Sequence, residues 1–278
     1  MRPDRFAASS GAVVCGAFAA LLLAERCRPL RRRVEPGLAR EARNLAVAAA
    51  SALAIRLVER PLVEPLAHAA VHRRRGLLQR RPLPAPLEAA LALALLDFTL
   101  YLWHILTHRV PFLWRFHLVH HVDLDLTAST ALRFHFAEMM VSVPWRAAQV
   151  ALIGVRPQVL RLWQTATLVE IMFHHSNLHL PLRLERRLGR LIVTPRMHGI
   201  HHANVREQTH ANWSSGLTVW DWLFGTLRLD VPQEAITIGV PAYRRAEALT
   251  LPRLLAMPFR RQPPSWQERS EDRTGGRS

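Results

Sequence analysis

Lysine is absent from this 278-residue sequence and cysteine is nearly so. All 37 basic residues are arginine, against 21 acidic residues, which gives a formal net charge of +16. The two cysteines leave no disulfide framework, because Cys15 lies inside an apolar run and Cys27 lies among arginines beyond its end. No HExxH, GxGxxG or zinc-finger spacing occurs. The sequence therefore lacks the signatures of zinc peptidases, dinucleotide-binding domains and zinc-finger nucleic-acid proteins.

Half of the residues are hydrophobic, yet long apolar runs are few. Five apolar segments are recognisable, at about residues 6–24, 45–58, 87–106, 138–153 and 158–173. Only the first and third approach the ~20 residues that cross a bilayer alone. Arg56 interrupts the second segment. The last two, which contain Arg146, Arg161 and Glu170, are expected to form a helical hairpin packed on other protein, with arginines reaching toward the interface.

The arginines are distributed as expected for a membrane protein. They form short runs beside apolar segments, at Arg26–Arg33, Arg73–Arg75 and Arg80–Arg81. This placement favours contact with anionic lipid, and no basic patch interleaved with aromatic residues supports nucleic-acid binding. The apolar run at 6–24 has no small-residue cleavage site before the following arginines, so we interpret it as a retained anchor. We expect an all-α, integral-membrane helical bundle with a histidine-rich helical cap on one membrane face.

Ten of the 15 histidines fall into four compact groups, and these carry the functional prediction. The members are His104 and His108; His117, His120 and His121; His175 and His179; and His198, His201 and His202. Residues three or four apart share one face of a helix, so each group would present its imidazoles in one direction. A single HxxxH pair is more typical of a polar helix face. Four groups together indicate metal ligation, because ten clustered imidazoles without a metal would leave many ring nitrogens unsatisfied.

The four groups are expected to meet on one membrane face. The interval between His108 and His117 is too short to cross a bilayer, and the interval between His179 and His198 is short and rich in charge. Ten imidazoles exceed the needs of one ion, whereas two ions could share them and keep open positions. Imidazole ligands alone do not distinguish iron from zinc, copper or nickel. Asp97 shares a predicted helix face with His104 and His108 and is the candidate for orienting their rings.

Several further motifs give the sequence a family resemblance. They are Asp97-Phe98 before His104 and His108, Phe116-His117-Leu118-Val119-His120-His121, Leu132-Arg133-Phe134-His135 with Glu138, Phe173-His174-His175-Ser176-Asn177, Thr194-Pro195-Arg196-Met197-His198-Gly199-Ile200-His201-His202, Asn212-Trp213, and Trp220-Asp221-Trp222-Leu223-Phe224-Gly225-Thr226. In order and spacing, residues 97–226 resemble the fatty acid hydroxylase and sterol desaturase superfamily of membrane-bound, histidine-rich, non-haem di-iron enzymes. Two features depart from the family pattern: Phe136 follows His135 where proline is common, and His179 matches less well than His175.

The resemblance implies a domain organisation and a set of supporting residues. Residues 1–86 would form membrane anchor segments and basic loops, residues 87–230 the catalytic domain with the hairpin at 138–173, and residues 231–278 a polar, partly disordered tail. Residues outside the ligand shell are expected to support it: Asp97, Arg133, His135, Glu138, Asn177, Asn212 and Asp221. Arg133 and Glu138 would form a structural pair, and Asp221 would hold the last histidine group. His174 and His210, like His135, are interpreted as supporting, core or surface residues.

The chemistry implied by the resemblance is oxidation of a lipid-like substrate. Two iron ions and dioxygen would hydroxylate or desaturate a fatty acyl, sterol-like or related molecule that enters from the bilayer. Because the sequence has neither a fused haem domain nor a dinucleotide fingerprint, electrons would come from a separate donor protein. The alternatives are a histidine-rich metal transporter or metal-binding membrane protein, which would place its ligands near the bilayer midplane, and a membrane metallohydrolase.

The histidine face is expected to be cytoplasmic, in a multi-pass protein of the inner membrane. The resemblance and the arginine-rich segment from Arg26 to Arg43 both favour this side. A second segment that crossed fully would place Arg73–Arg81 outside, against the same rule. Either that segment does not cross, or the charge bias fails here.

Overall fold

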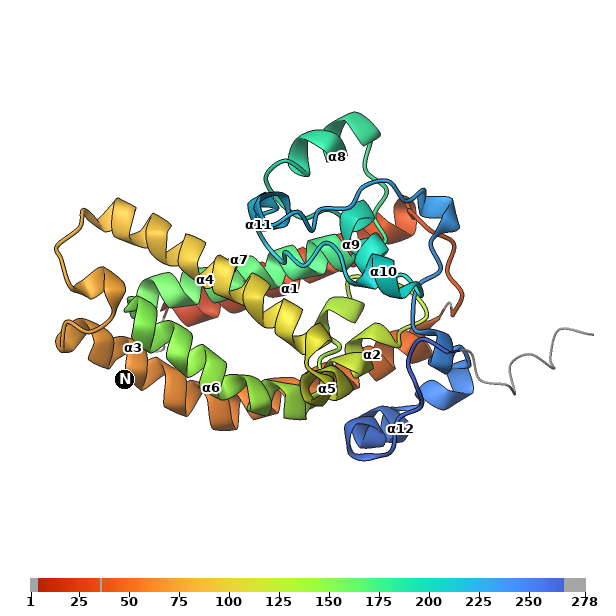
Figure 1. The fold of residues 1–278 in the computed structure, drawn as a ribbon, viewed down its shortest axis with the longest axis horizontal. Helices are drawn as coiled ribbons and strands as arrows, with labels where there is room; N and C mark the ends of the chain where they lie inside the picture. Colours follow the sequence, from red (N-terminus) through yellow and green to blue (C-terminus); the bar gives the residue numbers. More distant parts are fainter. Residues whose placement is uncertain (1–4, 36, 268–278) are drawn as a thin grey trace, which may run out of the picture.

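The computed structural model describes residues 5–35 and 37–267, and the regular elements among them are all helical (Figure 1). Within these residues β-structure is limited to three isolated bridges. The expectation of an all-α fold is confirmed for these residues. The α-helices are α1 (Arg5–Cys27), α2 (Leu38–Ala54), α3 (Arg60–His72), α4 (Ala85–Arg109), α5 (Pro111–His121), α6 (Phe136–Ile153), α7 (Pro157–His175), α8 (Leu182–Leu188), α9 (Pro195–His201), α10 (Arg206–Thr209), α11 (Val219–Leu223) and α12 (Leu251–Ala256).

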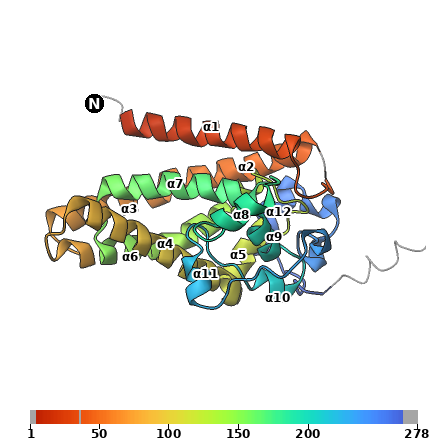
Figure 2. The same cartoon turned by 90° about the horizontal axis from the view of Figure 1, so that it is seen from above.

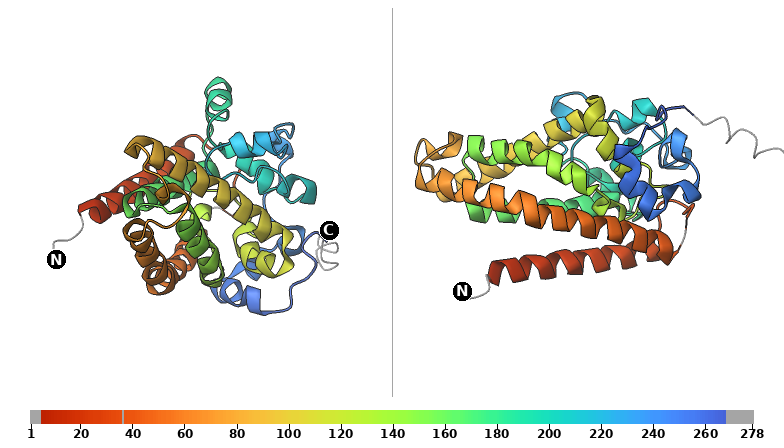
Figure 3. Two further views of the ribbon diagram at one scale, coloured as in Figure 1. Left: turned by 60° about the vertical axis from the view of Figure 1, so that its left-hand side comes forward. Right: turned by 90° about the horizontal axis from the view of Figure 1, so that it is seen from below.

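The long and the short helices occupy different parts of the molecule. The long helices run roughly along the longest axis, whereas α8 to α12 and their connecting loops gather toward the end where α4 and α7 finish (Figure 1). Figure 2 and the right-hand view of Figure 3 show α1 along the outside of the bundle, antiparallel to α2. Its packing partner is α7. The histidine-bearing helix ends therefore lie at the end of the molecule that carries the short elements.

Two described helices are long and apolar enough to cross a membrane. They cover Ser9–Cys27 and Ala85–Arg109, the two regions that the sequence singled out by length. In α4 a proline in the first turn favours initiation, and the helix ends at Arg109 because Val110 precedes Pro111 and adopts an extended conformation. Pro111 in turn begins α5. This sharp junction folds α5 back against α4 and brings their histidines together.

The second apolar segment lies in a helical run that extends from Leu38 to His72. Here α2 continues through a π-helical turn at Ile55–Glu59 into α3. A wider turn just before Pro61 accommodates a residue that cannot donate the usual backbone hydrogen bond. This run is not among the candidate membrane spans.

Helices occupy both segments for which the sequence predicts a hairpin. Helices α6 and α7 are separated by a three-residue connection in which Gly154 has φ +79°. A Cβ at that position would lie 2.7 Å from the Arg75 carbonyl oxygen, so glycine is required both by conformation and by space. Helix α6 packs on α2 and α3, and α7 packs on α1 and α9, which agrees with the expectation that both helices contact other protein.

Two apolar cores lie in the bundle and next to the histidine end. The first contains Val63, Leu96, Val150 and Trp163 from α3, α4, α6 and α7. The second joins α2 and α5 to the C-terminal segment, with Val47, Leu118, Val119, Tyr243, Leu249 and Leu254 buried together. Part of the expected polar tail is thus packed, because its scattered apolar residues lie on one side of α12 and the turns before it. Residues 268–278 lie outside the described residues.

Candidate metal centre

The structure gathers histidines from four helices into one buried cluster. They come from the last two turns of α4, from α5, from the end of α7 and from α9 with the residue after it. Each contributing histidine is at most 8% exposed. The cluster therefore lies inside protein although it is built largely from helix ends, where polar groups more often meet water.

Two four-histidine sets within this cluster are close enough to hold one ion each. The first histidine group is His104, His108, His121 and His201; the second histidine group is His120, His175, His198 and His202. Within each group the candidate ligand nitrogens all lie within 4.8 Å of one another. In the second group, Nε2 of His175 lies 2.9 Å from Nε2 of His120 and 3.0 Å from Nε2 of His198. Such convergence suits ligands of a common ion.

The two HxxHH motifs divide their adjacent histidines between the groups. His120 and His121 follow one another on α5, yet His120 belongs to the second group and His121 to the first. His201 and His202 are divided in the same way. Successive helical residues point about 100° apart, so one short helix can face two neighbouring centres. Each motif thereby holds the two groups side by side.

Backbone carbonyls fix the orientation of three rings. Nδ1 of His104 lies 2.7 Å from the Trp213 carbonyl oxygen, Nδ1 of His201 lies 2.9 Å from the Ala211 oxygen, and Nδ1 of His175 lies 2.7 Å from the Ile171 oxygen. A carbonyl oxygen only accepts, so Nδ1 must carry the proton in each case. Nε2 then presents its lone pair to the centre, the arrangement typical of a metal-bound histidine.

Many buried ring nitrogens in the cluster have no protein partner. Such atoms occur in both groups and include Nε2 of His121, Nε2 of His201 and both nitrogens of His108 and His202. Leaving so many polar atoms unsatisfied in the interior would cost about 1–3 kcal/mol each. Binding of divalent metal ions would satisfy them, so the residues present fit two metal ions.

Electrostatics keep the cluster neutral and ready for a cation. Burial, and next the charges of neighbouring imidazoles, lower the pKa of His121, His198 and His202 well below its usual value. These rings therefore hold no excess proton at neutral pH, and a metal does not have to displace one.

Two histidines lie beside the groups rather than inside them. His117 is 4.8 Å from His108 and 5.2 Å from His120 between ring centroids, with Nε2 buried and unpartnered. Its Nδ1 lies 2.8 Å from Oε1 of Glu138, and this carboxylate fixes the ring. His174, interpreted from the sequence as a supporting or core residue, is 1% exposed, has both nitrogens unpartnered and lies 4.1 Å from His198 between centroids.

His179 and His210 stand apart from the two groups. His179 is exposed, although the sequence placed it among the candidate ligands. Helix α7 ends at His175 and Ser176 adopts an extended ψ of 148°, so the i,i+4 spacing to His179 is not helical. His210 is partly buried, and its ring lies 5.8 Å from the Trp213 ring between centroids, inclined by 31°.

Two of the expected supporting acids, Asp97 and Asp221, contact the 211–226 segment rather than an imidazole ring. Asp97 accepts hydrogen bonds from the Leu217 amide and the Trp220 indole, and a Cβ at Gly216 would clash with its Oδ1. Asp221 accepts from the Trp213 and Ser214 amides. Because the same loop supplies the carbonyls that orient His104 and His201, both aspartates position the first group indirectly.

The remaining supporting residues also fix backbone segments. Asn212, with φ +53°, donates to the Met197 and Arg228 carbonyls and so ties the loop to α9. Asn177 pairs with both backbone groups of Arg31. His135 caps α6 by accepting from the Ala137 amide. The expected Arg133–Glu138 pair is replaced by two other contacts, since Arg133 lies 3.1 Å from Asp123 and Glu138 contacts His117.

A buried ion pair that the sequence does not predict lies just after the first HxxHH motif. Arg40 of α2 binds Asp123 through both Nε and Nη2, and both side chains are 1% exposed. Burial opposes ionisation of Asp123, but the charges of Arg40 and Arg133 hold its pKa below the usual value. The pair anchors α2 to the chain just after His121. Its partners are 83 residues apart, so the sequence carries no local signal for it.

Comparison with known proteins agrees with this geometry. The family model described as fatty acid hydroxylase matches residues 89–226. The chain is 30% identical over 161 residues to an ornithine lipid hydroxylase from Rhizobium tropici, 32% identical over 147 residues to a cholesterol 25-hydroxylase-like protein from Danio rerio, and 28% identical over 148 residues to human alkylglycerol monooxygenase.

The similarity covers only part of each protein. The matched segments make up 56%, 51% and 52% of this chain, and 46%, 56% and 31% of the respective relatives. No solved structure gives a significant match.

Proposed function

Because the chain belongs to the fatty acid hydroxylase family through residues 89–226, we propose that it is a membrane-bound di-iron oxidoreductase acting on a lipid-like substrate. The two buried histidine groups with unpartnered ring nitrogens carry this proposal. The names of the relatives favour hydroxylation over desaturation, and they favour a fatty acyl, sterol-like or related lipid as the substrate. Dioxygen would be the co-substrate, and a separate protein would donate the electrons.

In this proposal the metal ions supply the redox chemistry, and the chain orients the ligands and excludes water. Two iron ions, when bound, would supply the redox chemistry that activates dioxygen toward a C–H bond. The Trp213, Ala211 and Ile171 carbonyls hold the Nδ1 protons of His104, His201 and His175, which leaves their Nε2 atoms free to bind. Glu138 accepts the Nδ1 proton of His117 in the same way and leaves Nε2 of that ring free. Burial of all these rings excludes water from the reaction.

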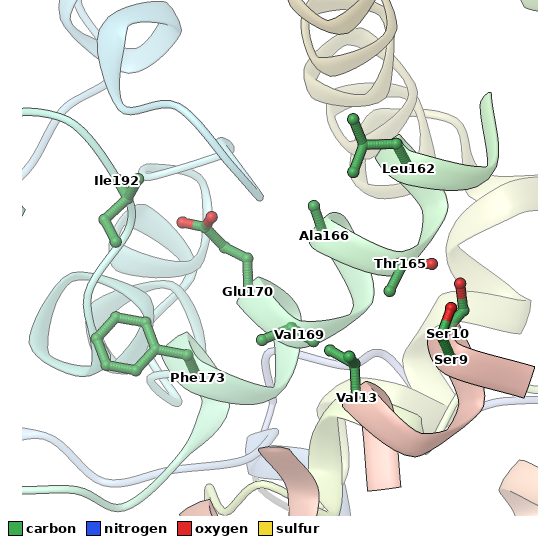
Figure 4. Close-up of a pocket in the computed structure, with 10 residues that line it drawn as sticks. All are labelled: Ser9, Ser10, Val13, Leu162, Thr165, Ala166, Val169, Glu170, Phe173 and Ile192. Atoms are coloured by element: carbon green, nitrogen blue, oxygen red, sulfur yellow. The ribbon is translucent and has the colours of Figure 1, made fainter. Parts of the chain in front are cut away.

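A groove between α1 and α7 suits the hydrocarbon part of a lipid. It has a volume of about 560 Å³ and is lined mainly by apolar side chains, including Val13 of α1 and Leu162, Val169 and Phe173 of α7 (Figure 4). The volume lies within the range of ligand pockets. Phe173 immediately precedes His174 and His175, so the groove runs toward the helix end that contributes to the second group. We propose that the substrate chain lies here.

The principal alternative is a metal transporter. A transport site would place ligands near the bilayer midplane, within broken spanning helices. Here the ligands are grouped at helix ends and on the short helix α9, at the end of the molecule away from the N-terminus of α4. The geometry supports an enzyme, and oxygen consumption that depends on an electron donor is the direct discriminating assay.

The substrate can be identified by comparative lipid mass spectrometry. A deletion strain and its complemented parent are compared, and gain of one oxygen in a lipid of the complemented strain supports hydroxylation. Loss of two hydrogens would instead indicate desaturation. Identical lipid profiles, together with no donor-dependent oxygen consumption by the purified protein, would overturn the proposal.

We further propose that the histidine end faces the cytoplasm of an inner membrane. Cysteine-accessibility labelling in the 203–211 segment tests this side directly. Labelling from the periplasm would contradict it.

A further inference from the structure

An exposed apolar surface flanks the candidate span α4 and is not used by the metal centre. On α11 and the residue after it, Trp222, Leu223 and Phe224 are 71%, 58% and 50% exposed. Leu191 is 67% exposed and its neighbour Ile192 forms a bridge with Leu217. The amide of Thr218 donates to the Leu191 carbonyl, so the two segments form one continuous surface. We call the surface formed by residues 182–191 and 217–224 the foot.

The position of the foot along α4 indicates what covers it. Phe224 stacks on Phe98 and Tyr101 of α4, with ring centroids 5.8 Å and 5.6 Å apart, and Trp220 lies 4.9 Å from Phe98. Helix α4 has 25 residues and is about 37 Å long, which exceeds the ~30 Å hydrocarbon core. If α4 begins at one edge of the core, the ~20 residues that cross it end near His104, so only the last turn, with His108, projects. Phe98 and Tyr101 then lie about 5–10 Å inside the near edge, and α11 lies beside them.

Charge on the foot complements a lipid surface. Helix α8 and the turn after it carry Arg183, Arg186, Arg187 and Arg190, all exposed, whereas Glu185 is buried in an ion pair with Arg196. Arginines next to exposed leucine and tryptophan are the pattern of a segment that lies in the membrane interface, where tryptophan is enriched and anionic head groups attract arginine. Figure 1 shows α8 and α11 projecting sideways from the bundle rather than from its end, as such a segment requires.

We propose that the foot is a membrane-interface element: Leu191, Leu217, Trp222, Leu223 and Phe224 contact acyl chains, and the α8 arginines contact anionic lipid phosphates. A water-soluble donor protein would need this face to be outside the bilayer. Its level beside Phe98 favours lipid. The inference rests on the proposed membrane crossing by α4 and extends it, because it adds a lipid contact made by the loop that orients His104 and His201.

Depth-dependent fluorescence quenching in proteoliposomes tests the proposal. Cys15 and Cys27 are first replaced by serine, and single cysteines are introduced at exposed positions: Trp222→Cys and Leu191→Cys in the foot, Leu91→Cys on α4, and Glu234→Cys in the polar end region. Each is labelled with an environment-sensitive fluorophore. Spin-labelled lipids are then added to full-length, iron-loaded protein in vesicles of phosphatidylcholine and phosphatidylglycerol.

The expected result is loss of fluorescence at both foot positions and at Leu91→Cys, with no loss at Glu234→Cys. Quenching at Leu91→Cys without quenching in the foot would overturn the foot while leaving the span of α4 intact. No quenching at either place would overturn the membrane crossing as well. Charge is tested separately: Arg186→Gln/Arg187→Gln/Arg190→Gln should reduce quenching of labelled Trp222→Cys in vesicles containing phosphatidylglycerol and leave it unchanged in pure phosphatidylcholine. In vesicles containing phosphatidylglycerol, equal quenching of labelled Trp222→Cys with and without the three arginine substitutions would contradict the head-group contact.

Discussion

His121 and His202 stack with ring centroids 4.2 Å apart and planes inclined by 11°, although they belong to different histidine groups. His121 comes from α5 and His202 from the residue after α9. The contact joins the two groups at their boundary, where both HxxHH motifs divide their adjacent histidines. We therefore expect the two metal sites to depend on one another rather than to fill independently.

His174 and His179 should respond in opposite ways to substitution. His179→Ala should leave metal content and activity nearly unchanged, because the side chain is exposed and outside both groups. His174→Ala should reduce both, because its two ring nitrogens are buried, unpartnered and next to His198. Iron analysis and oxygen uptake of the two purified variants provide the comparison. Loss of iron in His179→Ala with full retention in His174→Ala would reverse this assignment.

Glu138 should increase the metal affinity of the site by holding the His117 ring in place. Glu138→Ala removes the acceptor of the His117 Nδ1 proton, and loss of such a partner typically lowers metal affinity or activity about 10–100-fold. Glu138→Gln retains an acceptor oxygen and should recover part of the loss. Titration of the metal-free variants with iron measures the effect. Equal affinity of wild type and Glu138→Ala would show that the contact does not support the site.

The Arg40–Asp123 pair should be a large contributor to stability. Arg40→Leu leaves a fully buried carboxylate with only Arg133 as a charged partner, and breaking a buried pair typically costs about 3–5 kcal/mol. Thermal unfolding in detergent should give a markedly lower midpoint. Arg56→Leu, on an exposed part of the same helical run, is the control, and an equal effect of both substitutions would contradict the role of the pair.

The metal-free protein should lose stability as the solution becomes acidic. In the folded state burial lowers the pKa of His121, His198, His201 and His202, whereas an unfolded histidine titrates near ~6.5. Below that pH the unfolded chain binds more protons than the folded chain, so this stabilisation is complete above about pH 6.5 and is lost as the pH falls. Asp123, whose pKa is also lowered, adds a loss at still lower pH.

The measurement is the unfolding midpoint of chelator-treated protein across pH 8 to 5. We expect a continuous fall below ~6.5. The exposed His68 and His72 supply a control, since their replacement by glutamine should leave the slope unchanged. A midpoint independent of pH would show that the cluster is not buried and neutral without metal.

Helical spacing predicted the histidine cluster because the relevant motifs do lie on helices. His104 and His108 on α4 share the first group, and His198 and His202 share the second, as residues four apart on one helix face should. The adjacent histidines of each triplet instead belong to different groups. The prediction for His179 depended on α7 continuing past His175, and it ends there instead. Helical spacing predicts that two residues share a face only when both lie within the same helix.

Contacts that depend on tertiary packing have no pattern in the sequence from which they could be predicted. The Trp213 carbonyl that orients His104 is a backbone group, which any residue could supply. Asp97 lies on the predicted face of α4, but its side chain contacts the 217–220 segment rather than an imidazole. The Arg40–Asp123 pair depends on how α2 approaches the end of α5. Only the folded chain identifies these partners.

Metal analysis of the purified protein and matched histidine variants tests the central claim most directly. The wild type should contain about two iron ions per chain, one for each four-histidine group. His121→Ala and His120→Ala should each lose iron and activity, whereas His68→Ala, outside both groups and exposed, should retain two ions and full activity. A single tightly held zinc ion in the wild type, or equal iron contents in the grouped and ungrouped variants, would contradict the di-iron account.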